Sequence, residues 1–245
     1  MDSGYYAALT GLVARTQALD TAAANLANTQ TPGYRAEREY FRSTLLGPDS
    51  SNSQLGLVVN NYGLLGGDHL NMSQGALSLT GNPLDLAIEG QGFFQIQTPN
   101  GLRYTRDGSL RRTPQGQLVT NAGFPVLSTT GKTIQVPPGP ISIGADGVLS
   151  SAGGAVATIA VYDFASTDQL TPEGANQYIA PAGSTPTLTK KAGIHQGAVE
   201  SANEDVIQGT LDLIVMQRSA EMMQKALTVF HTEFNKTASE DLPRI

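Results

Sequence analysis

The chain has 245 residues, a formal net charge of −6 and neither Cys nor Trp. The lack of Cys excludes disulfides, thiolate metal sites and a Cys nucleophile, and an acidic chain without a basic stripe is not typical of a nucleic-acid binder. No apolar run approaches the roughly 20 residues that cross a bilayer, so no direct membrane insertion is expected.

The first predicted element is an amphipathic helix from about residue 3 to residue 28. Apolar residues recur there at alternating steps of four and three, which is a heptad pattern. The stripe consists of Tyr5, Leu9, Leu12, Thr16, Leu19, Ala23 and Leu26. An isolated helix is only marginally stable, so this stripe needs partners, and we expect the ends of a lone chain to fray until it assembles.

The helix ends in the stretch NLANTQTPGYR, residues 25–35. Pro32 cannot continue a helix and Gly33 permits a positive φ, so the chain is expected to turn away here. Asn25 and Asn28 lie on one edge of the helix. Their amides either cap the last carbonyls or fix the axial register between subunits, as buried polar residues do in coiled coils.

The middle of the chain predicts β structure. The chain contains 27 Gly and 13 Pro, which favour turns. Residues 31–80 are expected to form an extended linker and hairpin region, and residues 81–196 an antiparallel all-β domain. Asn-Gly and Asp-Gly pairs favour hairpins. The turn signals are Asn100-Gly101, Asp107-Gly108, Gln115-Gly116, Ala122-Gly123 and Asp146-Gly147.

A second helix is predicted from about residue 203 to residue 238. Ser201 and Glu204 fit a capping box at its start, with Asn203 as the competing N-cap. Its stripe keeps the alternation of the first helix: Val206, Gly209, Leu213, Met216, Ala220, Met223, Leu227, Phe230 and Phe234.

These elements predict an α+β fold in which long N- and C-terminal helices pair as a coiled coil, with a central antiparallel all-β domain. The expected domains are the N-terminal coiled-coil helix (1–30), the linker and hairpin region (31–80), the all-β domain (81–196) and the C-terminal coiled-coil helix (197–245). The helix residues expected to make assembly contacts are Leu9, Leu12, Leu19, Leu26, Leu213, Met216, Met223, Leu227 and Phe230.

The sequence gives little support to an enzyme. His69, His195 and His231 are scattered, and no HExxH, GxSxG or GxxxxGK[ST] motif is present. Neither a cofactor nor a metal is expected. Two other classes stay open: a secreted β-domain adhesin with coiled-coil ends, which needs a signal peptide or anchor, and a polysaccharide-active enzyme, which needs paired carboxylates and stacking aromatics.

Four stretches together resemble the bacterial flagellar rod and hook proteins. NLANTQTPGYR is similar to the family's N-terminal signature, and PLDLAIEGQGFFQIQTPNGLRYTRDGSLRRTPQGQLVTNAGFPVL to its central segment. QGAVESANEDV and MQRSAEMMQKAL are similar to its C-terminal segment. The chain departs from the family at Ala202-Asn203-Glu204, where Ser-Asn-Val is usual. Its two ends and the short segment between Thr31 and Asn82 are most like the proximal-rod type, with the distal-rod type as the alternative.

The resemblance implies a structural subunit of the flagellar basal-body rod, which polymerises helically into a hollow shaft that transmits torque. The implied partners are further copies, related rod and hook-family proteins and the flagellar type III export apparatus. The implied location is the periplasmic rod, reached without a cleaved signal peptide. The helix-end signature would comprise Asn25, Asn28, Pro32 and Gly33, and the candidate export-gate motif Phe41 and Leu45.

Overall fold

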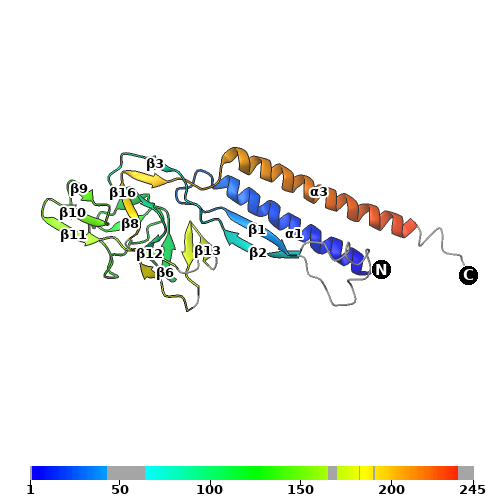
Figure 1. Ribbon diagram of the computed structural model, residues 1–245, viewed down its shortest axis with the longest axis horizontal. Helices are drawn as coiled ribbons and strands as arrows, with labels where there is room; N and C mark the ends of the chain where they lie inside the picture. Colours follow the sequence, from blue (N-terminus) through cyan, green and yellow to red (C-terminus); the bar gives the residue numbers. More distant parts are fainter. Residues whose placement is uncertain (1, 43–63, 165–169, 182, 190, 237–245) are drawn as a thin grey trace, which may run out of the picture. The chain divides into compact units, whose positions relative to one another are not determined.

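The computed structural model describes residues 2–42, 64–164, 170–181, 183–189 and 191–236, and its chain divides into two units (Figure 1). The helical unit contains Met1–Ala27, Glu37–His69 and Val206–Ile245. The β unit contains Asn28–Ala36 and Leu70–Asp205. The chain passes between the units at residues 27–28, 36–37, 69–70 and 205–206, so each unit is built from separate stretches of sequence.

The helical unit contains α1 (Asp2–Ala27), α3 (Val206–Lys236) and the two-stranded sheet of β1 (Glu37–Arg42) and β2 (Leu64–Leu70). Both predicted helices are confirmed. Figure 1 shows them side by side, and the Arg15 Nη1 atom donates a hydrogen bond to Ser219 Oγ at 2.5 Å. Among the described residues, no helix combines the length and the apolar character that crossing a membrane requires.

The prediction that the terminal helices pair as a coiled coil is wrong, although two helices and a β-rich body do make the chain α+β in class. A coiled coil inserts its stripe residues as knobs between the residues of the facing helix. On α1 the deeply buried side chains are instead small ones: Ala14 is 3% exposed and Ala18 is 5% exposed. The stripe residue Leu9 is 38% exposed. Neither alanine belongs to the predicted stripe: Ala18 lies one residue before Leu19, and Ala14 lies two residues before Thr16.

The buried alanine seam predicts that α1 tolerates bulk on one face only. Leucine at the buried Ala18 has no room, so Ala18→Leu is expected to destabilise the helical unit by about 1–3 kcal/mol. Ala23 belongs to the predicted stripe but is exposed, so Ala23→Leu is the matched control. Thermal unfolding followed by circular dichroism at 222 nm measures both. A larger loss for Ala23→Leu would restore the coiled-coil prediction.

The β unit contains several small antiparallel sheets and one larger one. In the described residues the largest sheet has the order β13 (Thr171–Gly174), β14 (Gln177–Ile179), β6 (Gly101–Thr105), β5 (Phe93–Thr98), β12 (Val161–Asp163), β15 (Thr187–Leu188). A second has the order β11 (Gly154–Thr158), β10 (Val148–Ser151), β9 (Ile141–Ile143). The pairs are β16 (Gly193–Gln196) with β4 (Leu86–Glu89), β17 (Ala198–Glu200) with β3 (Leu77–Leu79), and β7 (Leu110–Arg112) with β8 (Leu118–Thr120).

Most predicted turns are confirmed by the strand pairings. Asn100-Gly101 connects β5 to β6, Gln115-Gly116 connects β7 to β8, and Asp146-Gly147 connects β9 to β10. Asp107-Gly108 is not a hairpin turn, because β6 and β7 belong to different sheets. Gly108 serves a close approach instead: its carbonyl accepts from the Leu86 N–H, and a Cβ at Gly108 would lie 1.6 Å from the Leu86 carbonyl oxygen.

The β unit has two apolar cores. The larger one contains Leu86, Phe94 and Ile96 together with buried aliphatic residues of β7 to β10, of β12 and of β16, and of the loops between them. The smaller one is aromatic, and its Tyr104 and Phe164 rings meet edge to face at a centroid distance of 4.8 Å. The strand β5 contributes to both cores, with Phe94 and Ile96 in the larger one and Phe93 in the smaller one. The loop after β6 begins at Arg106, whose guanidinium contacts both the Ile88 carbonyl and the Phe93 ring.

Candidate functional site

The stretch that follows α1 enters the β unit as a docked segment, which we call the docking segment, residues 31–36. Asn28 closes the turn before it: its carbonyl accepts from the Thr31 N–H at 2.9 Å, and its Oδ1 accepts from the Thr31 hydroxyl. The Pro32 carbonyl accepts from Asn176 Nδ2 at 2.5 Å. Gly33 has a φ of +69°, and its N–H donates to the Glu200 carbonyl at 2.7 Å.

Gly33 is fixed by space as well as by conformation. A Cβ at this position would lie 2.4 Å from the backbone carbon of Arg106 and 2.6 Å from the backbone nitrogen of Asp107. A residue with a side chain would also be strained at this φ. The sequence TPGYR therefore places its glycine where the docking segment touches the loop after β6.

Three charged side chains are buried together beside Gly33. Arg35 is 2% exposed, Arg106 is 4% exposed and Glu200 is 1% exposed. The Arg35 Nη2 atom lies 2.8 Å from Glu200 Oε1, and the Arg106 Nη1 atom lies 3.0 Å from Glu200 Oε2. The Glu200 Oε1 atom also accepts from the Gly75 N–H at 2.9 Å. One carboxylate from the end of β17 thus binds two guanidinium groups from distant parts of the sequence.

The Arg106 guanidinium is held through its two Nη atoms and through one face of its plane. Its Nη1 donates to the Ile88 carbonyl and its Nη2 to the Gly90 carbonyl at 2.6 Å, while its guanidinium carbon lies 5.3 Å from the centre of the Phe93 ring. Burial lowers the pKa of Arg106 to about 10, against the opposing effect of Glu200, so the group is charged at neutral pH. Two buried cations share one anion, so removing Glu200 would leave both without a counter-charge.

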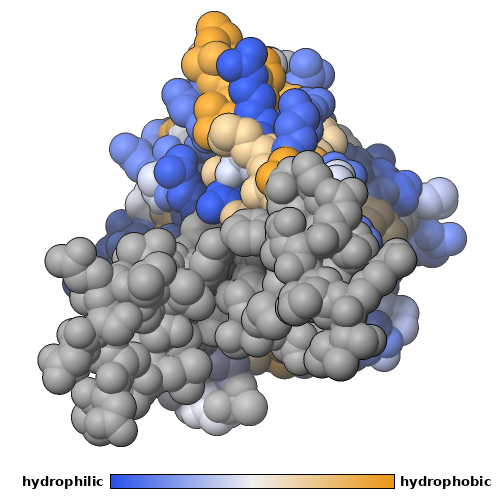
Figure 2. All heavy atoms as spheres, turned by 90° about the vertical axis from the view of Figure 1, so that its right-hand side faces the viewer, coloured by the Kyte–Doolittle hydropathy of each residue, from blue (hydrophilic) through white to orange (hydrophobic). Residues whose placement is uncertain are grey.

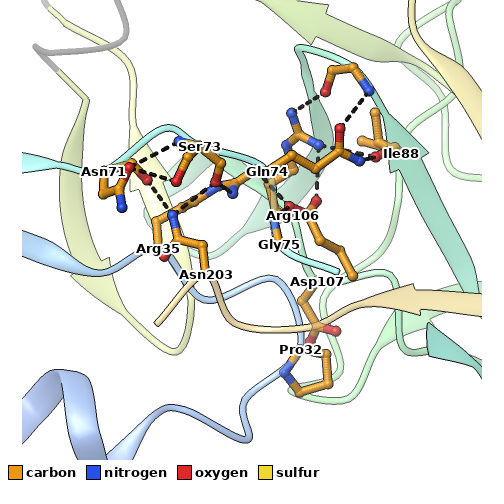
Figure 3. A network of polar contacts seen from close by, with 12 residues as sticks. Pro32, Arg35, Asn71, Ser73, Gln74, Gly75, Ile88, Arg106, Asp107 and Asn203 are labelled. Carbon is orange, nitrogen blue, oxygen red and sulfur yellow. Dashed lines mark hydrogen bonds and ion pairs between the residues drawn. The ribbon is translucent and has the colours of Figure 1, made fainter. Parts of the chain in front are cut away.

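The polar contacts extend to the loop before β3 and to the stretch after β17 (Figure 3). Asn203 Nδ2 donates to the Asn71 and Ser73 carbonyls at 2.6 and 2.9 Å, and its Oδ1 accepts from the Ala36 N–H at 2.8 Å. Arg35 Nη1 also donates to the Ser73 carbonyl. We call residues 200–203 the return segment, and Arg35, Arg106, Glu200 and Asn203 the docking cluster.

The predicted capping box is wrong, because α3 begins at Val206 rather than at residue 203. The residues assigned to it have other roles. The Ser201 N–H donates to the Ala76 carbonyl, and its hydroxyl contacts that of Ser78. Asn203 uses its amide to hold the docking segment. The departure from the family at Ala202 leaves this neighbouring asparagine in place.

Asn25 of the helix-end signature makes its hydrogen bonds within the chain. Asn25 is buried, and its amide bonds Glu37 in both directions: Nδ2 donates to the carbonyl at 2.8 Å and Oδ1 accepts from the N–H at 3.0 Å. Asn25 thereby fixes the start of β1 against the end of α1. Phe41 lies in β1 by its backbone, and Leu45 of the candidate export-gate motif lies outside the described residues.

The predicted helix residues are spread along both helices of the helical unit. Leu9 is exposed, and the side chain of Phe230 lies outside the described residues. The others are half-buried: Leu12, Leu19, Leu26, Leu213, Met216, Met223 and Leu227.

Sequence reasoning missed the docking cluster. Arg35 closes the quoted signature, but Arg106 and Glu200 are 94 positions apart in a chain with 36 charged residues, 15 basic and 21 acidic. No local signal marked them, because each has other charged residues near it in the sequence, such as Glu37 near Arg35, Asp107 next to Arg106 and Glu204 near Glu200.

The arrangement holds backbone rather than a ligand. In the described part of the chain, no group of three or more His, Asp or Glu side chains could hold a metal ion. Both carboxylate oxygens of Glu200 are occupied by protein donors, and His195 meets Glu89 on an exposed surface. The geometry is that of a structural site, which joins the docking segment to the return segment within the β unit.

Comparison with known proteins supports a structural role for the chain. A family model described as flagella basal body rod protein matches residues 6–35, and one described as the flagellar hook protein FlgE/F/G D1 domain matches residues 87–151. The flagellar basal-body rod protein FlgF of Caulobacter vibrioides is 33% identical, with 100% of both chains covered. FlgF of Mesorhizobium japonicum is 36% identical over 90% of each chain. FlgG of Bacillus subtilis is 30% identical over 91% of this chain and 93% of its own.

The chain belongs to the family of flagellar basal-body rod and hook proteins, whose members are structural proteins rather than a class of enzymes. The match over residues 6–35 runs from α1 to Arg35, the docking segment's buried cation. The resemblance found in the sequence is thereby confirmed.

Proposed function

We propose that this chain is a structural subunit of the flagellar basal-body rod, and that its copies join through the terminal helices to further copies and to related rod and hook-family proteins. The observation that carries the assembly is a second apolar face on α3. The face that carries the predicted stripe is half-buried at Leu213, Met216 and Met223. Because this face is already partly covered within one chain, contacts with another subunit have to come from the second face.

The second face is formed by residues that do not belong to the predicted heptad stripe of α3. At about 100° per residue, its members fall within an arc of about 100°, nearly opposite the first stripe. They are large and apolar, and they are exposed by 42–73%: Ile207, Leu211, Ile214, Val215, Met222 and Val229. Figure 2 shows hydrophobic side chains gathered along the top of the view, where α3 runs.

Six exposed apolar side chains on one face of a helix, with Arg218 and Lys225 among them, are typical of an interaction site. Burying a large aliphatic side chain contributes about 1.5–3 kcal/mol, so several such residues together support stable association. We infer that another subunit of the rod covers this face.

Charge placed on this face tests the proposal. Leu211→Glu with Ile214→Glu is expected to leave α3 helical, because both positions are exposed, and to abolish swimming and rod assembly in complemented cells. Gln224→Glu adds a charge at an exposed position outside the face and is expected to swim normally. Swimming in soft agar and electron microscopy of basal bodies measure the two. Normal rods in the double variant would remove this face from the assembly.

We further propose that the assembled rod is hollow and transmits torque, and that the flagellar type III apparatus delivers the chain to its periplasmic part. The family membership supports these points. The short segment between Thr31 and Asn82 supports the proximal type over the distal one. Cryo-electron microscopy of basal bodies that carry a tagged chain tests the assignment, since a tag at the distal end of the rod would contradict it.

A further inference from the structure

Most of the contacts that hold residues 33–36 of the docking segment come from the return segment. Its Gly33 N–H and Arg35 guanidinium both bind Glu200, through the carbonyl and the carboxylate. Its Ala36 N–H donates to Asn203 Oδ1, and its Tyr34 carbonyl accepts from the Asn203 N–H at 3.3 Å. The return segment thus supplies a partner to four successive residues, 33 to 36.

The return segment depends on the docking segment in the same way. Four of its groups bind residues 33–36: the Glu200 carbonyl, the Glu200 carboxylate, the Asn203 Oδ1 atom and the Asn203 N–H. Loop residues complete the arrangement from the side. Asn203 Nδ2 and Arg35 Nη1 share the Ser73 carbonyl, and the Asn71 N–H donates to the Ala36 carbonyl.

We propose that the two segments form a reciprocal latch, in which residues 31–36 stay docked on the β unit only while residues 200–203 are in place, and the reverse. The electrostatics support this coupling, because the buried ion pair between Arg35 and Glu200 is lost when either segment departs. Withdrawal of Glu200 leaves both Arg35 and Arg106 without their counter-charge, and withdrawal of Arg35 leaves Glu200 with Arg106 as its only cation in the docking cluster.

The latch goes beyond the role of rod subunit and does not depend on it, because all its contacts lie within the β unit of a single chain. In the sequence, the docking segment closely follows the end of α1, and the return segment closely precedes the start of α3. Opening the latch therefore releases the connections to both terminal helices at once.

Amide exchange on the purified full-length chain tests the latch, with each reporter chosen on a bond that the substitution does not remove. Asn203→Ala is expected to speed exchange at the Gly33 N–H, which binds Glu200, by at least tenfold. Arg35→Met is expected to speed exchange at the Ser201 N–H, which binds the Ala76 carbonyl, by a similar factor. The Leu127 N–H, bonded to the Gln95 carbonyl in the larger core, is the reference and should not change.

Glu173→Gln is the matched control, because it removes a carboxylate that pairs with Arg103 elsewhere in the β unit. It should leave the Gly33 and Ser201 reporters within twofold of the parent chain. Unchanged reporters in Asn203→Ala and Arg35→Met would show that the segments open independently. Equal acceleration at Leu127 would show loss of the whole β unit rather than a latch. Either result overturns the proposal.

Discussion

Replacement of Glu200 by alanine is expected to lower the free energy of unfolding of the β unit by about 3–5 kcal/mol, because the change leaves two buried guanidinium groups without their counter-charge. The lost bond to the Gly75 N–H adds to the cost. Denaturant unfolding followed by near-ultraviolet circular dichroism reports on this unit, because the buried Tyr104 and Tyr178 lie in its smaller core.

The triple change Glu200→Ala, Arg35→Met and Arg106→Met separates charge from shape. Apolar replacement of a whole buried ion cluster is often neutral, so the triple variant is expected to recover a large part of the stability lost in Glu200→Ala. Glu173→Ala, which breaks a more exposed ion pair in the same unit, is expected to cost far less. An equal loss in Glu200→Ala and Glu173→Ala would mean that burial of the cluster has no energetic weight.

Gly33→Ala is expected to cost more than a positive φ alone can explain. The new Cβ would meet the backbone of Arg106 and Asp107 at 2.4–2.6 Å, and backbone cannot turn aside as a flexible side chain can. The docking segment must therefore shift away from Glu200. Swimming in soft agar is expected to fall to the level of a strain without the protein.

Gly81→Ala is the control that isolates the strain. Gly81 has a φ of +74°, close to the +69° of Gly33, but a Cβ there meets nothing within 4 Å. The strain of the left-handed conformation alone costs about 1–2 kcal/mol. Overpacking is expected to make the loss in the free energy of unfolding of the β unit about 1–3 kcal/mol larger in Gly33→Ala than in Gly81→Ala. Equal effects at the two glycines would mean that the docking segment yields without cost.

Local signals in the sequence predicted the helices, the end of α1 and several turns, because these features depend on residues that are close in sequence. The break after α1 follows from Pro32 and Gly33, and the turns at Gly116 and Gly147 follow from residues that adopt a positive φ. Helix existence and approximate length also follow from periodicity, since α1 and α3 lie within a few residues of the expected bounds.

Packing partners could not be predicted in the same way. The heptad pattern marks Leu9, but burial depends on what lies opposite, and the buried seam passes through Ala14 and Ala18. Small residues carry little hydropathy, so a pattern of large apolar side chains does not reveal a seam made by close approach of backbones. The same holds for Ser201, whose capping pattern is real in sequence but whose hydroxyl meets Ser78 across β17 and β3.

The docking cluster was beyond sequence reasoning for a geometric reason. Arg35 and Glu200 are separated by most of the chain, and they meet only because β17 pairs with β3 and carries Glu200 back beside residues 33–36. A charged residue has no periodicity that announces its burial. Only the assembled sheet shows that these groups neutralise one another.

Cryo-electron microscopy of basal bodies purified from cells that lack this chain tests the central claim most directly, with the intact chain restored as the comparison. A rod interrupted in the mutant and complete in the restored strain, with density for the restored chain inside the rod, is the expected result. A complete rod of normal length in cells without the chain would contradict its role as a rod subunit.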